Sequence, residues 1–216
     1  MDTSIPSKED STTVQSVSAD SIPPPRKTLT GKRIILKPPD PEDDGPLCAV
    51  FSDLKTMAYL PQFHRAQGWT LDEMTQYRLE TEDEYLQGQR LRLNIHFLEK
   101  TEKGGETSTV AGITGFKLKG DGRGEFGIIL HHPFWRKGVN TEASYLLLQY
   151  GFEGLGLTRI DWYTRSDNVA MRKWCEDLGM EAYEVPGLEM GESVGFSLSH
   201  EEWISEVRHL LEQRLS

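Results

Sequence analysis

The residues best suited to chemistry lie in a short loop between a strand and a helix. A strand-like run ends at Leu130, and the segment 131–138 that follows contains Arg136 and Lys137 before Gly138 and a long helical stretch. The first N–H groups of a helix lack partners within the helix and carry the positive end of its dipole. With mobile cations beside it, such a corner can hold a diphosphate. The loop matches neither GxGxxG nor GxxxxGK followed by Ser or Thr, so Rossmann and P-loop sites are not favoured.

Three titratable side chains lie close in sequence to these cations: Glu125 within the strand, and His131 and His132 at the start of the loop. The pKa of a free imidazole lies near neutrality, so either histidine could exchange a proton at physiological pH. Adjacent residues of a strand point to opposite sides, so at most one of the two faces the site. A metal site made from these histidines and His96 lacks the spacing of a ligand set, and we expect no metal.

Hydrophobic periodicity predicts the elements that position these residues. Thr70 begins a capping box with Glu73, Asn168 is the expected N-cap of a later helix, and Gly179 follows the end of that helix. Glycine-rich breaks at 104–105 and 120–122 join three strands into an antiparallel meander. Helices are expected over 43–53, 70–87, 141–155, 168–178 and from 201 onward, and strands over 32–37, 90–99, 109–119, 123–130, 159–164, 181–185 and 193–198.

This order predicts a mixed α/β (α+β) domain around one central, mostly antiparallel sheet flanked by helices. A strand-helix-strand unit at its centre carries the loop. Residues 1–28 differ from the rest because they are rich in Ser, Thr and Pro, and the first aromatic residue of the chain is Phe51. We expect a disordered tail over 1–28 and one domain over 29–216.

Composition limits the class of protein. Hydrophobic residues make up 37% of the chain, which is enough for a core, and the formal net charge is -10. An acidic chain without a basic surface is not a general nucleic-acid binder. Cys48 and Cys175 lie far apart, so neither a disulfide framework nor a cysteine metal site is indicated. No run reaches the ~20 apolar residues of a membrane span, so the expected location is the cytoplasm, alone or with the nucleus.

The segments LTGKRIILKP (29–38), FWRKGVNTEA (134–143), 145–180 and 197–203 resemble, in this order, the GNAT superfamily of N-acetyltransferases, in particular its RimJ/RimL-like branch. The stretch FWRKGVNTEA (134–143) is similar to the loop that binds the pyrophosphate of acetyl-CoA, whose pattern is Gln/Arg-x-x-Gly-x-Gly/Ala. The continuation over 145–180 resembles the next helix, strand and helix of the branch, LTGKRIILKP (29–38) its first strand, and 197–203 its last strand and Glu-Trp. This sequence departs from the family pattern at three positions. Trp135 stands where the pattern has Gln or Arg, Asn140 replaces the final Gly or Ala, and Arg136 replaces a frequent Gly.

The resemblance covers roughly residues 29–204 and implies a fold, a donor substrate and a set of binding residues. The implied fold is a sheet of about seven strands, in which a splayed strand pair forms the acetyl-CoA site. No metal is implied, and the acyl donor is acetyl-CoA. The implied cofactor-binding residues are Ile129, Leu130, Trp135, Arg136, Lys137, Gly138, Val139, Asn140, Thr141 and Asn168.

The implied reaction is direct attack of a neutral primary amine on the thioester. Glu125 is the expected base, because related enzymes often place a catalytic Glu on this strand. His131 or His132 could serve instead, and His131 is the candidate catalytic residue of the two. The backbone N–H of Ile129 or Leu130 is the expected donor to the carbonyl oxygen. Cys175 occupies the position where many relatives have a Tyr that protonates the leaving thiolate; it could instead be a small buried apolar residue.

The acceptor is expected to bind at the variable loops 61–69 and 186–192. Phe63, His64 and Trp69 are candidate contacts, although Trp69 could equally pack under the long helix. The acceptor is a small-molecule amine or a protein N-terminus, and the protein is a monomer or a homodimer. The alternative function is a non-catalytic acyl-CoA-binding or interaction module on the same fold.

Overall fold

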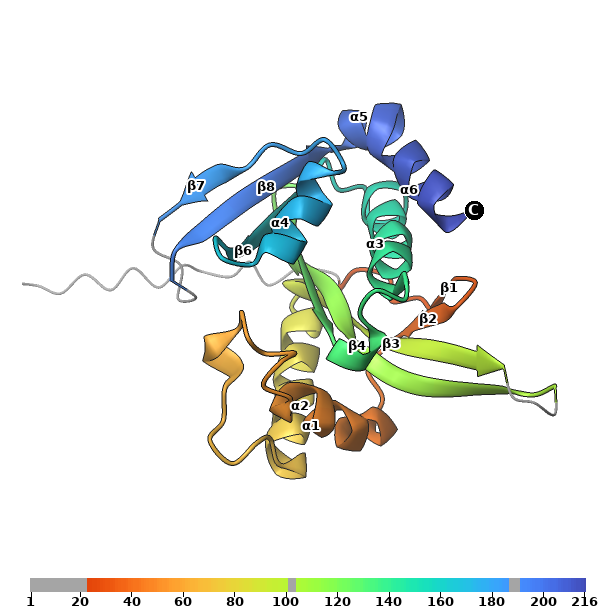
Figure 1. Ribbon diagram of the computed structural model, residues 1–216, viewed down its shortest axis with the longest axis vertical. Helices are drawn as coiled ribbons and strands as arrows, with labels where there is room; N and C mark the ends of the chain where they lie inside the picture. The colour runs from red at the N-terminus through yellow and green to blue at the C-terminus, as the bar shows by residue number, and fades with distance from the viewer. Residues whose placement is uncertain (1–22, 101–103, 187–190) are drawn as a thin grey trace, which may run out of the picture.

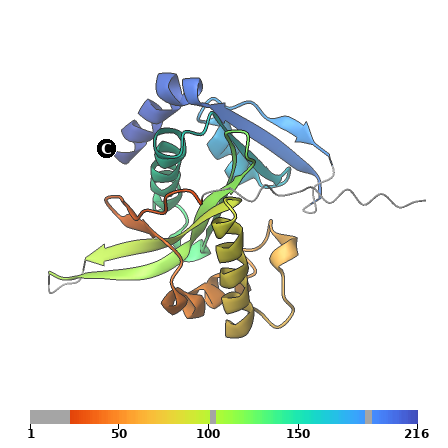
Figure 2. The ribbon, with the colours of Figure 1, turned by 180° about the vertical axis from the view of Figure 1, so that it is seen from behind.

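The computed structural model describes residues 23–100, 104–186 and 191–216, and the statements below concern these residues. One eight-stranded sheet forms the centre, in the order β1-β2-β3-β4-β5-β6-β8-β7 (Figures 1 and 2). All neighbouring strands are antiparallel except β5 and β6. The strands are β1 Leu29–Thr30, β2 Ile34–Lys37, β3 Arg90–Lys100, β4 Glu106–Leu118, β5 Arg123–Leu130, β6 Arg159–Arg165, β7 Tyr183–Val185 and β8 Ser193–Ser199.

Helices cover both faces of the sheet. The α-helices are α1 Asp44–Ser52, α2 Leu71–Leu86, α3 Val139–Gln149 and α4 Val169–Glu176, followed by the last helical segment of α5 His200–Glu202, a π-helical turn over Trp203–Val207 and α6 Arg208–Leu215. A further π-helical turn, Tyr150–Gly154, extends α3, and short 3-10 turns occupy Pro41–Asp43, Pro61–Phe63 and His132–Phe134. None of the helices in the described ranges has the length and apolar character that crossing a bilayer requires.

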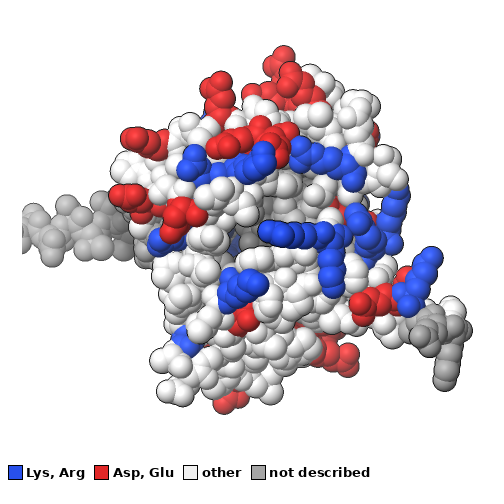
Figure 3. Space-filling model, viewed as in Figure 1, with Lys and Arg blue, Asp and Glu red and all other residues white. Residues whose placement is uncertain are grey.

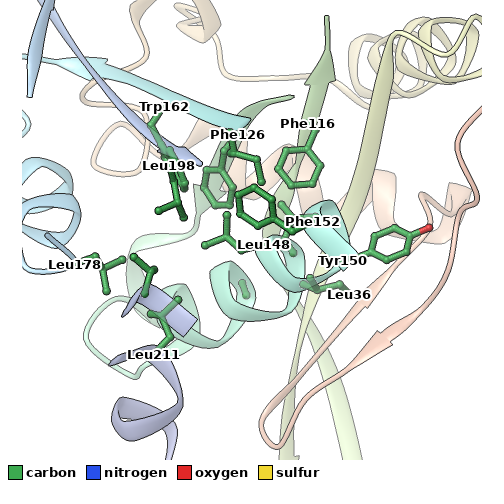
Figure 4. Packing of buried hydrophobic residues seen from close by; sticks show 14 of the residues in the cluster. Leu36, Phe116, Phe126, Leu148, Tyr150, Phe152, Trp162, Leu178, Leu198 and Leu211 are labelled. Carbon is green, nitrogen blue, oxygen red and sulfur yellow. The ribbon is translucent and has the colours of Figure 1, made fainter. Parts of the chain in front are cut away.

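The core is divided by the sheet. On one face, α3, α4 and the last helical segment pack on the sheet through the cluster shown in Figure 4, which includes Phe116, Phe126, Trp162 and Leu211. On the other face, α1 and α2 enclose a smaller cluster that includes Ile113 of β4 and Ile129 of β5. Among the strands, helix α1 packs mainly against β4 and α2 against β3, and β5 follows β4 in the strand order.

The predicted mixed α/β architecture and the β3-β4-β5 meander are confirmed, as is the capping box of Thr70 and Glu73 at the start of α2. The structure has eight strands because the short β1, which the sequence pattern did not separate, pairs with β2. Helix α3 begins at Val139 rather than Thr141, since Gly138 is already its N-cap.

Part of the predicted tail contacts the domain. Tyr85 donates its hydroxyl to the carbonyl oxygen of Pro24 at 3.0 Å, and Tyr150 donates to that of Pro25. The guanidinium of Arg26 lies 3.4 Å from the centre of the Tyr85 ring and pairs with Glu82 at 2.7 Å. Pro24 to Arg26 therefore contact the domain, although they lie within the segment 1–28 that the sequence predicted to be a tail. The rest of the predicted tail, 1–22, lies outside the described residues.

Candidate active site

Strands β5 and β6 part at the centre of the sheet. Their parallel pairing extends from Arg123 opposite Arg159 to Phe126 opposite Trp162, yet β5 continues to Leu130 and β6 to Arg165. On its other side, β5 stays paired with β4 up to Leu130. The second half of β5 therefore has one edge that β6 does not cover, which is the splayed pair that the resemblance implied.

Backbone alternation decides which groups of β5 face this gap. His131 donates its N–H to the carbonyl oxygen of Ala111 at 2.8 Å, which makes Leu130 and Gly112 a non-hydrogen-bonded pair of the antiparallel ladder. The N–H of Leu130 consequently points away from β4, toward the gap, and that of Ile129 points to β4. Of the two expected donors to a carbonyl oxygen, only Leu130 has the required direction.

The loop after β5 has the backbone of an anion site. Arg136 is the one non-glycine residue in the described ranges with a positive φ, at 60°, and Gly138 has a φ of 76°. Gly138 caps α3 without a side chain, and the N–H of Glu142 makes the first intrahelical bond back to Gly138 at 3.1 Å. The N–H groups of the first turn thus remain for a ligand, and left-handed residues beside them turn successive N–H groups to one side.

Positive charge borders this region of the surface. Arg136 and Lys137 are exposed, and the ammonium of Lys137 lies 5.3 Å from the centre of the Phe134 ring. In the view of Figure 1, the surface is hollowed between the part that carries α4 and the part that carries α1 and α2, and Lys and Arg side chains border the hollow (Figure 3). The net charge of the chain is negative, so this cationic border is a local feature.

Glu125 lies one residue before the point where β5 and β6 part. By alternation it shares a face with Ile129, which packs under α1 and α2. Its carboxylate pairs with the ammonium of Lys119 at 2.8 Å, and its side chain is 24% exposed. This carboxylate is accessible to water beside the gap, which is what a base that acts through a water molecule needs.

The two histidines after β5 differ in their surroundings. Burial lowers the pKa of His131. His132 donates through Nδ1 to Asp53 Oδ1 at 2.9 Å, and its backbone N–H donates to the hydroxyl of Thr56 at 2.9 Å. Thr56 also donates to the same Asp53 oxygen through its N–H and its hydroxyl, both at 2.6 Å. With Nδ1 as donor, His132 keeps Nε2 as a proton acceptor.

Burial alone would raise the pKa of Asp53, but the hydrogen bonds from Thr56 and His132 hold it below its ordinary value. The ligand atoms of Asp53, His131 and His132 lie within 4.8 Å of one another, a grouping that could hold a metal ion. However, Oδ1 of Asp53 already accepts three hydrogen bonds. These hydrogen bonds account for the closeness of the three side chains, because Asp53 orients the ring of His132.

Two candidates on the chain after β6 have defined positions. Asn168 caps α4 as expected: its Oδ1 accepts from the N–H of Met171 at 3.3 Å, and its Nδ2 donates to the hydroxyl of Thr164 at 3.0 Å. Cys175 is fully buried in the core, and burial raises the pKa of its thiol to about 12. A thiol so placed is a poor proton donor to a leaving thiolate, and its position fits the alternative of a small buried apolar residue.

The acceptor candidates form a packed aromatic group. Phe63 and Trp69 contact Phe51 of α1, with ring centres 5.4 and 5.0 Å away, and Tyr77 of α2 at 6.0 and 5.9 Å. Trp69 donates its indole N–H to the carbonyl oxygen of Phe63 at 2.8 Å. His64 Nε2 lies 2.8 Å from the carbonyl oxygen of Met57. These side chains fasten the loop 61–69 to α1 and α2. The second acceptor loop falls largely on 187–190, outside the described residues.

The residues that sequence reasoning did not single out are Asp53, Thr56, Arg33 and Glu142. Asp53 and His132 are 79 positions apart, and Arg33 and Glu142 109, so no local pattern links either pair. For Glu142 the chain did offer a signal, an acidic residue in the first turn of a helix that begins beside two cations.

Comparison with known proteins identifies the architecture. Residues 33–181, more than half of the chain, match the sequence model of the family described as Acetyltransferase (GNAT) domain. The chain belongs to the GNAT acetyltransferase family. A crystal structure of a GCN5-related N-acetyltransferase from Brucella melitensis superposes with a TM-score of 0.70 at 21% identity, covering 90% of this chain and 89% of that one.

Two relatives extend this assignment to the type of enzyme. The "Uncharacterized N-acetyltransferase p20" of Bacillus licheniformis is 29% identical over 160 residues, which cover 72% of this chain and 83% of the relative. The "FsC-acetyl coenzyme A-N(2)-transacetylase" of Aspergillus fumigatus is 32% identical over 91 residues, 38% of each chain. The predicted GNAT fold and N-acetyltransferase class are confirmed by these matches.

Proposed function

We propose that this protein transfers an acetyl group from acetyl-CoA to a primary amine. The observation that carries the proposal is the parting of β5 and β6 beside the N-terminus of α3, where Gly138 leaves the first N–H groups without a side-chain cap. The gap suits an extended thioester arm, and the loop with Arg136, Lys137 and Gly138 suits the diphosphate. The GNAT family membership of the chain supports the same assignment.

The residues of the chain divide the work as follows. Backbone N–H groups of the 136–141 segment bind the diphosphate, with Arg136 and Lys137 adding charge. The N–H of Leu130 donates to the thioester carbonyl oxygen and stabilises the negative charge that develops there during attack. Acetyl-CoA, when bound, supplies the activated acyl group. Because Cys175 is buried, the sulfur leaves as the thiolate.

The acceptor must lose a proton before or during attack. Glu125 is the proposed base, acting through water at the edge of the gap. His132, oriented by Asp53, is the second group able to take the proton. An α-amine with a pKa of about 7.7 to 8.0 needs less help than a lysine-type amine with a pKa of about 10.4. A small-molecule amine and a protein N-terminus are both candidate acceptors.

A non-catalytic acyl-CoA-binding module is the second candidate, favoured by the buried cysteine where relatives place a proton donor. Turnover of acetyl-CoA distinguishes the acetyltransferase from the non-catalytic module. Purified protein is incubated with acetyl-CoA and a panel of amines, polyamines and short peptides, and free thiol is followed. Thiol release that depends on one acceptor class supports the enzyme. Binding of acetyl-CoA without release of free thiol with any acceptor of the panel supports the non-catalytic module.

The same assay assigns the base. Glu125→Gln and His132→Asn are compared at several pH values with the acceptor that gives release. The variant that removes the base should lose rate most at low pH, where the amine is most fully protonated. The other variant should retain the pH profile of the parent protein.

A further inference from the structure

A buried carboxylate joins the turn between β1 and β2 to the first turn of α3. The side chain of Glu142 is 4% exposed. Its Oε1 accepts the backbone N–H groups of Lys32 and of Arg33, the latter at 3.1 Å, and its Oε2 accepts Nε of Arg33 at 3.1 Å. Gly31 makes room for this contact, since a Cβ there would lie 2.3 Å from Oε1. An acidic group is therefore fixed one turn into the helix that begins at the anion site.

Arg33 extends from this carboxylate to the loop itself. Its Nη1 donates to the carbonyl oxygen of Lys137 at 3.1 Å. Its guanidinium lies against Gly138, where a Cβ would come within 2.8 Å of both terminal nitrogens. The side chain of Arg33 is 44% exposed. A cation from β2's leading turn thus lies beside the loop that contains Arg136 and Lys137.

This arrangement resolves an electrostatic conflict. An acidic residue near a helix N-terminus is stabilised by the helix dipole, but the same end would also receive the phosphates of a bound ligand. Two anions close together repel, and the repulsion is stronger where one of them is buried. Arg33 neutralises Glu142 and so removes that repulsion.

We propose that Arg33 and Glu142 are positioning residues that set the charge of the phosphate-binding loop. Glu142 holds the Arg33 guanidinium against Gly138, and Arg33 cancels the buried negative charge that would otherwise oppose the phosphates. The proposal rests on the proposed function because its ligand is CoA. The proposal predicts opposite effects on binding and stability. Removing the charge of Glu142 should strengthen binding of CoA and lower the stability of the protein.

The test measures the dissociation constant of CoA by isothermal titration calorimetry with the full chain at two salt concentrations. Thermal unfolding of each variant checks that it is folded. In Glu142→Gln the amide oxygen can still accept from the turn, and Arg33 keeps its hydrogen bond to the carbonyl oxygen of Lys137. Arg33 then lies beside the loop as an unbalanced cation. A unit charge on the order of 10 Å from a phosphate changes affinity by about fivefold. We expect a dissociation constant about fivefold lower, with a steeper salt dependence, despite a lower Tm.

The other variants complete the charge comparison. Arg33→Gln should raise the dissociation constant by about fivefold or more, Arg33→Lys should restore part of the loss, and the double variant Arg33→Gln/Glu142→Gln should return close to the parent. Glu153→Gln is the matched control: it removes a carboxylate at the opposite end of α3, where Glu153 pairs with Arg208, and should leave affinity unchanged.

Each outcome bears on the proposal. Unchanged or weaker CoA binding by folded Glu142→Gln would show that the pair only braces the fold. If Glu142→Gln does not fold, Arg33→Gln decides, and an unchanged dissociation constant overturns the proposal. If the parent protein binds no CoA, the proposed function fails and this inference with it. If the parent binds CoA and only the variants disagree, the proposed function stands alone.

Discussion

Glu125 lies at the end of the paired part of β5 and β6, on the face that α1 and α2 cover farther along the strand. If it takes the proton of the amine, Glu125→Gln should lower kcat/KM by about 100-fold, at the low end of what general base catalysis contributes, and leave binding of acetyl-CoA unchanged. Steady-state thiol release measures this. Glu184→Gln, on the exposed strand β7, is the control. An unchanged kcat/KM would remove Glu125 from the mechanism.

Cys175 illustrates the opposite case, a candidate whose surroundings are apolar. Because the thiol is fully buried, Cys175→Ala should keep kcat within about twofold of the parent and lower the free energy of unfolding by about 1 to 2 kcal/mol. Urea unfolding and the thiol-release rate measure the two effects. A large loss of kcat in a folded variant would return Cys175 to the site.

Individual residues were predictable where the signal was local. Asn168 as a cap and Gly179 as the left-handed residue after α4 follow from residue type and spacing, and both are confirmed. The pairing of His132 with Asp53 was not predictable, because it depends on α1 ending beside the end of β5. Nor could spacing show that Cys175 points into the core.

Helix α2 depends on its N-terminal cap. Thr70 and Glu73 exchange hydrogen bonds in a capping box, and the side chains of both are solvent-accessible. Thr70→Ala should lower the free energy of unfolding by about 1 kcal/mol while acetyl transfer is retained. The urea midpoint measures the loss, and Thr107→Ala, on an exposed part of β4, is the control. Equal midpoints for both variants would contradict the importance of the cap.

The loop before α3 requires glycine for two reasons. Gly138 has a φ of 76°, and an added Cβ would meet the Arg33 guanidinium. Gly138→Ala should lower stability by about 1 kcal/mol and raise the dissociation constant of CoA by about tenfold. Gly156 also has a positive φ, 68°, but nothing within 4 Å of the Cβ position, so Gly156→Ala should lower stability alone. Equal CoA affinity in the two variants would contradict a role for Gly138 in binding.

At the level of elements, periodicity located the meander, the long α2 helix and the strand-helix-strand unit. It misplaced the start of α3, because the helix is capped by a glycine rather than by the Ser, Thr, Asp or Asn that marks most starts. It also missed β1 and began the first strand at Lys32, which lies in the turn before β2. That turn is shaped by Glu142, a residue distant in sequence, so local pattern could not resolve it.

Over the whole of the described chain, three aspartates that are buried or half-buried have lowered pKa values. In each, burial alone would raise the pKa, and hydrogen bonds outweigh it: Asp43 from His96 and Asn94, Asp53 from Thr56 and His132, and Asp161 from Ser197, Arg123 and Arg159. Their folded-state pKa values lie below the unfolded value of about 3.9, so the unfolded chain binds protons first as pH falls. The stability they contribute is present above about pH 4 and is lost as pH falls through the folded-state values.

The free energy of unfolding should therefore fall as the pH is lowered from about 5 to 3. Urea midpoints at several pH values test this. Asp161→Asn should be less stable at pH 7 and show a shallower decline in acid, because one of the linked groups is gone. A midpoint that does not change over this range would contradict the assigned shifts.

The domain boundary is also a property of the whole molecule. A Pro-rich segment with few apolar side chains indicated a tail up to residue 28, but Tyr85 and Tyr150 bind the carbonyl oxygens of Pro24 and Pro25. These contacts are made by backbone carbonyl oxygens, so the composition of the segment could not predict them. The overall architecture, in contrast, followed from the order of elements and from the resemblance over most of the chain.

The measurement that tests the account most directly is thiol release from acetyl-CoA by the purified full chain with a panel of amine acceptors, alongside thermal unfolding with acetyl-CoA alone. We predict that acetyl-CoA raises the Tm and that one acceptor class gives catalytic thiol release. A Tm that acetyl-CoA does not change, with no release from any acceptor, would contradict the assignment of the gap between β5 and β6 and the loop before α3 as an acetyl-CoA site.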